Sequence, residues 1–243
     1  MKVLAPALSV MLTSHCKPRW LEEAICSVLG QTRRDLELVV ADSGQWIGRD
    51  DGTSAEMQRV HAAYAGHPLV VWVTTGERPA LQHRVCPAAW AQNQVIRAGL
   101  LRGRYFTLFY DDDLYLPEFA EQMAGFLDAN PAAQAVWCSQ EQKRQEGDGF
   151  VSEAFRMATV PKQAGQFDCQ VDGGQVMMRT SLLTLVGDPW VPEEPGAGSC
   201  SHIDGLFFER MAVHAGVVPP LPDQGVLCVN RRTTLSVNRP VRG

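Results

Sequence analysis

Cysteine pairs of the kind that hold zinc are absent from this sequence. Its seven cysteines are scattered, and no two of them form a Cys-x-x-Cys arrangement. An odd, scattered set also does not fit a disulfide framework, which small secreted domains build from an even number of cysteines. We therefore expect free thiols and a cytoplasmic protein without a structural zinc site.

Long apolar runs and an excess of positive charge are absent as well. No run approaches the ~20 residues that span a bilayer, and the N-terminus lacks the order of charged, apolar and small residues that marks a signal peptide. The net charge is −5, with 22 Lys and Arg against 27 Asp and Glu. These features argue against an integral membrane segment and against nucleic acid as a partner.

A regular alternation of apolar strands and amphipathic helices is present instead. The hydrophobic periodicity predicts strands at 8–13, 36–41, 69–73 and 105–110, and helices at 21–29, 54–65, 88–102 and 117–130. This order predicts an α/β fold with a mostly parallel central sheet flanked by helices.

The second part of the chain has a different texture. We predict strands at 135–138, 171–178 and 225–230, helices at 182–186 and from 204, and a polar loop at 140–148. The length fits a single domain over 1–243, in which 1–131 binds a nucleotide and 132–243 binds an acceptor.

The most informative stretch is the strand at 105–110, which runs directly into the aspartate cluster, Asp111, Asp112 and Asp113. Carboxylates crowded at the end of a buried strand repel one another unless a cation or hydrogen-bond donors neutralise them. Mg²⁺ binds through such oxygens and usually shares them with substrate phosphates. The stretch predicts a metal-assisted reaction on a phosphorylated ligand, although acids also favour helix N-termini.

Polar groups follow several predicted strands. They are Thr13-Ser14-His15, Asp42-Ser43, the aspartate cluster and the region near Asp172. In open α/β sheets, ligands bind beyond the carboxyl ends of the strands. We therefore expect these groups to line one crevice.

An ordered series of motifs resembles family 2 glycosyltransferases, and the resemblance covers about residues 5–225. The motifs are Pro6-x-x-Ser9-Val10-x-x-Thr13, Ile25-x-Ser27-Val28-Leu29-x-Gln31-Thr32, Asp35-x-Glu37-x-Val39-x-x-Asp42, Gln92-Asn93-Gln94-Val95-Ile96, the aspartate cluster with Leu114-Tyr115-Leu116-Pro117, Val176-Met177-x-Arg179-x-Ser181-Leu182-Leu183, Ile203-Asp204-Gly205-Leu206-Phe207-Phe208 and a downstream Pro220-Leu221-Pro222-Asp223. Within the family, the chain is similar to the bacterial spore-coat polysaccharide glycosyltransferase.

The resemblance implies the GT-A fold and an inverting enzyme. It implies transfer of a sugar from a UDP- or dTDP-linked donor to an acceptor hydroxyl, with Mn²⁺ or Mg²⁺ as cofactor. The expected partners are the nucleotide-sugar donor and a small-molecule or glycan acceptor, and a homodimer is left open.

The resemblance also assigns residues that bind the donor. Thr13, Ser14 and His15 match the segment that lies against the nucleotide base, and Asp42 matches the acid that contacts uracil. Ser43 stands where the family usually has a second Asp or Asn, so either Asp42 or Ser43 meets the base.

Other residues match the part of the family's site that binds the ribose and the diphosphate. Arg84 and Asn93 match the segment that approaches these groups, where an arginine offers phosphate a charge-assisted partner. Arg231, Arg232 and Arg239 either close over the diphosphate or form a solvated tail.

Within the aspartate cluster, the resemblance makes Asp113 the metal ligand and Asp112 a ribose or sugar contact, with Asp111 assisting. Tyr110 takes the first place of the usual Asp-x-Asp-Asp pattern. The spore-coat relative also lacks that acid, so the departure is compatible with activity.

Inverting displacement needs a carboxylate that accepts the proton of the attacking hydroxyl. Asp204 matches the catalytic base of the family, although an aspartate that opens a helix is also a common N-cap. Asp172 and His202 are the alternative bases.

Two other functions remain open. A nucleotidyltransferase that makes activated sugars would share the sheet and the metal chemistry, but residues 14–19 hold no glycine to form a triphosphate-binding loop. A non-catalytic sugar-nucleotide-binding protein is the other, and the retention of Asp113 and Asp204 argues against it.

Overall fold

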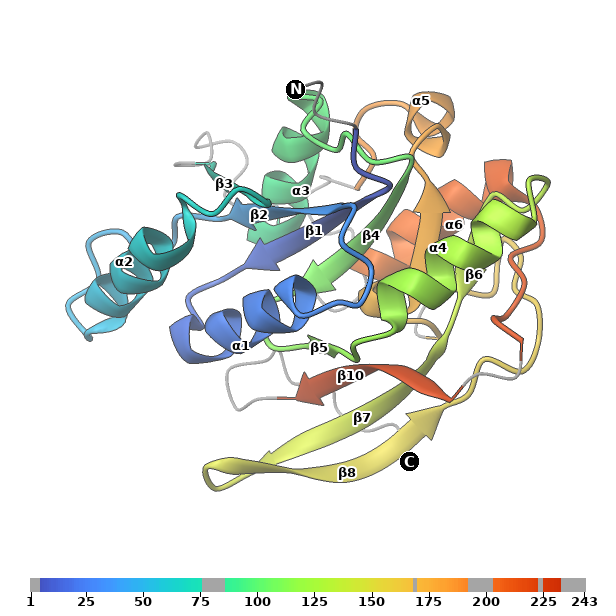
Figure 1. Cartoon of the computed structure of the whole chain (residues 1–243). Coiled ribbons are helices and arrows are strands. Elements are labelled where there is room, and N and C mark those ends of the chain that lie inside the picture. The colour runs from blue at the N-terminus through green and yellow to red at the C-terminus, as the bar shows by residue number, and fades with distance from the viewer. Residues whose placement is uncertain (1–4, 76–85, 168–169, 192–202, 223–224, 233–243) are drawn as a thin grey trace.

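The computed structural model describes residues 5–75, 86–167, 170–191, 203–222 and 225–232. The larger of its two sheets has the strand order β3-β2-β1-β4-β9-β6 (Figure 1). β1 to β4 run parallel, whereas β9 is antiparallel to both β4 and β6. The strands are β1 (Leu8–Ser14), β2 (Leu36–Asp42), β3 (Val70–Thr74), β4 (Tyr105–Tyr110), β6 (Ala135–Trp137) and β9 (Val176–Arg179). The predicted α/β fold with a mostly parallel sheet is confirmed.

Helices cover both faces of this sheet. Leu8, Val10 and Leu12 of β1 pack with helices α1, α2 and α4, whereas Met11 packs with α3, α5 and α6. The helices are α1 (Pro18–Leu29), α2 (Thr53–Tyr64), α3 (Pro87–Arg97), α4 (Phe119–Ala129), α5 (Leu182–Val186) and α6 (Ile203–Ala215). Burial on both faces explains why β1 and β2 read as continuous apolar runs rather than as alternating patterns.

None of the helices in the described ranges combines the length and apolar character needed to cross a membrane.

A second sheet has the strand order β5-β10-β7-β8. Its strands are β5 (Leu114–Tyr115), β7 (Ser139–Glu146), β8 (Gly149–Arg156) and β10 (Val226–Arg232). β5 begins directly after the aspartate cluster and pairs with β10. The second sheet therefore meets the first at the carboxyl end of β4, where the predicted site lies.

The polar loop predicted at 140–148 is wrong, because these residues form the first strand and the turn of a β-hairpin. β7 pairs with β8 around a two-residue turn, Gly147-Asp148, in which Gly147 has φ +59°. A positive φ at the first turn residue suits a tight hairpin and favours glycine. The strand was missed because its residues are Ser, Gln, Glu, Lys and Arg, which give no apolar alternation.

Two other predicted elements were too long. The helix at 88–102 ends at Arg97, and Gly99 follows with φ +64°. The strand at 171–178 begins only at Val176, because Asp172 caps the short 3-10 helix η2 (Gly173–Gln175).

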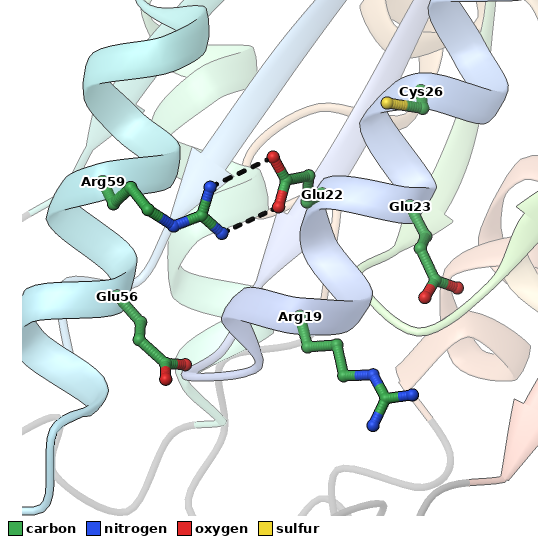
Figure 2. A pocket seen from close by; sticks show the side chains of 6 residues that line it. All are labelled: Arg19, Glu22, Glu23, Cys26, Glu56 and Arg59. Carbon is green, nitrogen blue, oxygen red and sulfur yellow. Dashed lines mark hydrogen bonds and ion pairs between the residues drawn. The ribbon is translucent and has the colours of Figure 1, made fainter. Parts of the chain in front are cut away.

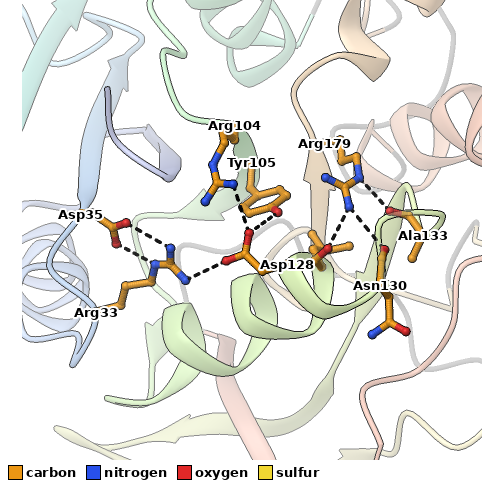
Figure 3. Close-up of polar contacts among 9 residues, drawn as sticks. Arg33, Asp35, Arg104, Tyr105, Asp128, Asn130, Ala133 and Arg179 are labelled. Carbon is orange, nitrogen blue, oxygen red and sulfur yellow. Dashed lines mark hydrogen bonds and ion pairs between the residues drawn. The ribbon is translucent and has the colours of Figure 1, made fainter. Parts of the chain in front are cut away.

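Polar contacts fix the end of α4 against the sheet (Figure 3). Tyr105 on β4 donates its hydroxyl to Asp128 at 2.7 Å, and Arg33 and Arg104 form ion pairs with the same carboxylate. Arg179 on β9 donates to the backbone carbonyl of Ala133 at 2.9 Å. These contacts hold α4 on the face away from α3.

Candidate functional site

The ends of three parallel strands bring the predicted polar groups together. Thr13 of β1 lies opposite Tyr110 of β4, and Ser14 lies opposite Asp42 of β2. The backbone N–H of His15 donates to Asp111 Oδ2 at 2.6 Å. The expected convergence of the first, second and fourth strand ends is therefore confirmed.

All three carboxylates of the aspartate cluster are buried, with exposed fractions of 3%, 6% and 2% for Asp111, Asp112 and Asp113. Lys17, in the loop between β1 and α1, places its ammonium 2.6 Å from Asp112 Oδ2 and 3.3 Å from Asp111 Oδ1. One cation of the chain thus serves two of the three acids.

Asp113 has different partners. Its Oδ1 accepts the backbone N–H of Arg231 at 3.1 Å and lies 3.3 Å from Asn230 Nδ2. Its Oδ2 is buried and has no hydrogen-bond partner among the described residues. A buried, unpartnered carboxylate oxygen suits a hard divalent cation, so Asp113 fits the predicted metal-ligand role.

Burial and the charge of Asp112 raise the pKa values of Asp111 and Asp113. Burial, followed by the charge of Asp112, raises the pKa of Asp113 well above its usual range. Burial also raises the pKa of Asp111 to about 6, against the opposing effect of Lys17. Burial alone would lower the pKa of Lys17, but Asp111 and Asp112 outweigh it and raise that pKa. The cluster is therefore short of positive charge, as a cation-binding site requires.

No group of three or more His, Cys, Asp or Glu side chains within the described ranges forms a ready-made metal cage. Mg²⁺ characteristically uses one or two carboxylates together with substrate phosphates rather than an all-protein cage. The donor set at Asp113 is of that kind.

Arg231, which the sequence left as a phosphate contact or a solvated tail, is a buried part of the cluster. Its Nε donates to the backbone carbonyl of Asp112 at 2.5 Å, and its Nη1 pairs with Glu23 on α1. Its guanidinium lies 5.2 Å from the ring centroids of both Trp20 and Phe150. Its Nη2 has no partner among the described residues. Arg231 therefore joins β10, α1 and the β7–β8 hairpin to the aspartate cluster.

The carboxylate of Asp42 is fully buried and surrounded by donors. Trp46 Nε1 lies 2.8 and 3.0 Å from its two oxygens, and Gly44 N–H donates at 2.9 Å. Trp72 Nε1 and Thr74 Oγ1 each lie 3.3 Å from Oδ2. The sequence does not predict that two indoles donate to Asp42, because Trp46 lies in the loop after β2 and Trp72 lies on β3.

The other residues predicted to bind the base line the same edge. Ser43 Oγ lies 3.3 Å from His15 Nδ1. Thr13 Oγ1 accepts a hydrogen bond from Gln92 at 2.9 Å. Ser14 Oγ is buried without a partner among the described residues.

Asn93 is fully buried on α3 and holds a backbone segment. Its amide exchanges two hydrogen bonds with the backbone of Val191, at 2.8 and 2.9 Å. Its proposed contact with ribose or diphosphate stays a prediction. Arg84, the alternative base His202 and Arg239 lie outside the described residues.

Asp204 lies in the first turn of α6 and faces η2, directly before β9. Its Oδ2 accepts the N–H of Gly173 at 3.0 Å, and its Oδ1 accepts the N–H of Gly205 at 3.0 Å. Tyr110 lies beside it: burial, followed by the charge of Asp204, raises the pKa of Tyr110 well above its usual range. Gly173, which donates to Asp204, also lies against the Tyr110 ring, so Asp204 lies near the exit of β4.

Asp172, the alternative base, is engaged by the second sheet. Its carboxylate forms an ion pair with Arg156 at 3.2 Å. The ion pair therefore ties Asp172 to the second sheet.

A surface depression of about 500 Å³ lies between α1 and α2 (Figure 2). Arg59 forms a two-pronged ion pair with Glu22 across it, at 2.7 and 3.2 Å. Its lining contains none of the residues predicted to bind the donor or the metal. We therefore place the functional site at the strand ends and not in this depression.

Comparison with known proteins gives an independent view of the chain. Residues 9–182 match the family model described as Glycosyl transferase family 2. The chain is 28% identical to Protein CgeD of Bacillus subtilis (strain 168) over 240 residues. This alignment covers 97% of this chain and 52% of Protein CgeD. The chain thus spans about half the length of this curated relative.

Two solved structures resemble the fold. One is S. aureus TarS 1-349 in complex with UDP, with TM-score 0.61, 17% identity, and coverage of 93% of this chain and 60% of that chain. Another is the mannosyltransferase PcManGT from Pyrobaculum calidifontis in complex with GDP-Man and Mn²⁺, with TM-score 0.58, 20% identity, and coverage of 94% and 57%. These likenesses show that the chain has the GT-A fold.

Proposed function

The chain belongs to glycosyl transferase family 2, and from that membership we propose that it is an inverting, metal-dependent glycosyltransferase that uses a UDP- or dTDP-linked sugar. The observation that carries the proposal is the buried aspartate cluster at the exit of β4, with one oxygen of Asp113 left without a partner among the described residues. Such an oxygen suits a cation that is shared with the diphosphate of a donor.

Asp204 is the proposed catalytic base. In-line displacement with inversion needs one carboxylate to accept the proton of the acceptor hydroxyl on the face opposite the leaving group. The N–H groups of Gly173 and Gly205 orient the Asp204 carboxylate. Asp172 is the less suitable base because Arg156 holds it.

The aspartate cluster is the proposed diphosphate centre, with Asp113 as metal ligand, Asp112 as ribose or sugar contact and Asp111 assisting. When bound, Mn²⁺ or Mg²⁺ supplies positive charge that stabilises the departing nucleoside diphosphate. Arg231 keeps Asp112 and Asp113 in place through their backbone and side-chain oxygens.

The base-binding wall is proposed to be Thr13, Ser14, His15 and the Asp42-Ser43 pair. Because Trp46 and Trp72 already donate to Asp42, we assign direct contact with the base to Ser43 and orientation of this wall to Asp42. The UDP and UDP-GlcNAc complexes of TarS support a uridine donor. The GDP-Man complex of PcManGT makes GDP a necessary comparison.

Residues 1–131 are proposed to bind the donor and residues 132–243 to bind the acceptor, a small molecule or a glycan, beside Asp204. A homodimer stays a prediction, which light scattering of the purified protein tests.

A thermal-shift screen tests the donor class. The purified protein is heated with UDP, dTDP, GDP or CDP, each with and without Mn²⁺. A ligand at a hundred times its Kd stabilises the folded state by about 2.7 kcal/mol. We expect a metal-dependent rise in Tm with UDP or dTDP. A protein that responds to none of the nucleotides would contradict the proposal.

A further inference from the structure

Lys17 places its ammonium within the aspartate cluster. Its ammonium lies between two buried carboxylates, 2.6 Å from Asp112 and 3.3 Å from Asp111. The Lys17 side chain is itself only 11% exposed. A buried ammonium without carboxylate partners would be an uncompensated charge, and so would the buried carboxylates without the ammonium. Each therefore stabilises the ionised form of the other.

The backbone fixes Lys17 in this position. Cys16 has φ +56°, a left-handed conformation that residues other than glycine rarely adopt. The turn at Cys16 lets its two neighbours reach one carboxylate, since His15 N–H donates to Asp111 Oδ2 and the Lys17 ammonium faces Asp111 Oδ1. Pro18 then begins α1 and limits how far Lys17 can shift.

We propose that Lys17 is a resident counter-ion that competes with the divalent cation for Asp111 and Asp112. In the protein without donor, a divalent cation is left with the Oδ2 of Asp113, which has no partner among the described residues, and it therefore binds weakly. The donor's diphosphate offers the ammonium new acceptors, so Lys17 can leave the two carboxylates as the metal enters. This inference rests on the proposed function for the metal.

The competition follows from electrostatics. A divalent cation and an ammonium that share the same carboxylates repel each other in this buried site, where charges interact more strongly than in bulk water. Mg²⁺ and similar ions also keep part of their hydration shell and need room for it. Removing the ammonium takes this contact away from Asp111 Oδ1 and Asp112 Oδ2 and removes the repulsion.

Direct Mn²⁺ binding without nucleotide tests the inference, with the EPR signal of free aqueous Mn²⁺ as the readout. We expect Lys17→Met to bind Mn²⁺ about tenfold more tightly than the unmodified protein, a change of about 1.4 kcal/mol. The control is Lys143→Met on β7, where Lys143 faces Glu141 at 3.3 Å. It should leave Mn²⁺ affinity unchanged.

A second pair of variants covers the case in which Lys17→Met fails to fold with its acids uncompensated. Lys17→Met/Asp111→Asn removes one charge of each sign, and it is compared with Asp111→Asn alone. The double variant should bind Mn²⁺ severalfold more tightly than the single one, because Asp112 has lost its ammonium.

Equal Mn²⁺ affinity in the presence and absence of Lys17, in both pairs of proteins, overturns the inference while leaving the proposed function intact. Failure of every protein to bind Mn²⁺ even with UDP contradicts the metal-dependent function itself. Tighter Mn²⁺ binding without Lys17 supports the inference whether or not a sugar-transfer assay succeeds.

Discussion

Gly173 lies so close to Tyr110 that a Cβ on Gly173 would stand 2.6 Å from Cε2 of the tyrosine ring. The same glycine donates its N–H to Asp204 at 3.0 Å. Tyr110 ends β4, immediately before the aspartate cluster. This contact therefore links the exit of β4 to the segment that orients the proposed base.

Gly173→Ala should reduce both stability and turnover. The new methyl group has to displace the Tyr110 ring or the Gly173 backbone, and overpacking of this kind costs about 1 to 3 kcal/mol. The N–H that orients Asp204 moves with the backbone. Thermal unfolding and steady-state rates of sugar transfer measure the two effects.

Gly174→Ala is the matched control for this substitution. The nearest atom to a Cβ on Gly174 lies 3.7 Å away, on Tyr115, which is ordinary contact. We therefore expect Gly173→Ala to lose activity and Gly174→Ala to keep it. Equal losses in both variants would show that the Tyr110 contact has no special role.

Asp204→Asn should abolish sugar transfer while leaving donor binding in place. An amide keeps the size of the side chain but cannot accept the proton, and general-base catalysis contributes about a hundredfold to ten-thousandfold in rate. Transfer rates and calorimetric binding of the nucleotide separate the two effects.

Asp172→Asn serves as the comparison for the base, because Arg156 already holds that carboxylate. We expect its loss of rate to be much smaller than that of Asp204→Asn. A larger loss of transfer rate in Asp172→Asn than in Asp204→Asn would make Asp172 the base.

Trp46→Phe should weaken nucleotide binding through Asp42. The substitution removes an indole donor from a fully buried carboxylate, and a lost partner for a buried charged group costs about 1 to 3 kcal/mol or more. Reorientation of Asp42 also disturbs the adjacent Ser43. Tm and the Kd for UDP are the measurements.

Trp190→Phe removes an indole donor elsewhere, since Trp190 Nε1 donates to the carbonyl of Leu183 at 2.6 Å. It should lower Tm without changing the Kd for UDP. If Trp46→Phe also leaves the Kd for UDP unchanged, Asp42 does not contribute to binding of the base.

Arg231→Met should weaken donor binding far more than Arg232→Met. Arg231 is buried and contacts Asp112 and Asp113, whereas Arg232 is 39% exposed and faces Glu153 at 3.3 Å. An exposed ion pair contributes about 0 to 1 kcal/mol. Calorimetric titration of UDP in the presence of Mn²⁺ compares the two variants. Similar affinities would show that Arg231 has no special role in donor binding.

The mostly parallel sheet covered by helices was predictable because its strands are largely apolar runs and its helices carry apolar stripes. The convergence of Thr13, Asp42 and the aspartate cluster followed from topology alone, since parallel strands end at one edge. Neither conclusion required knowledge of a single side-chain contact.

The second sheet and the charge balance of the site were less accessible. β7 is polar along its whole length, so only the Gly147-Asp148 turn marked the hairpin. Lys17 was a lone cation in a loop, and its role appears only once three buried acids are seen to need neutralisation. The indole donors on Asp42 come from separate elements, which spacing in the sequence does not reveal.

Metal-dependent nucleotide binding at Asp113 tests the central claim most directly. Calorimetric titration of UDP and dTDP into the unmodified protein and into Asp113→Asn, with and without Mn²⁺, is the measurement. The account predicts that Mn²⁺ tightens binding of one of these nucleotides at least about tenfold in the unmodified protein, and that Asp113→Asn loses this gain. Metal-independent binding, or a full Mn²⁺ effect in Asp113→Asn, would contradict it.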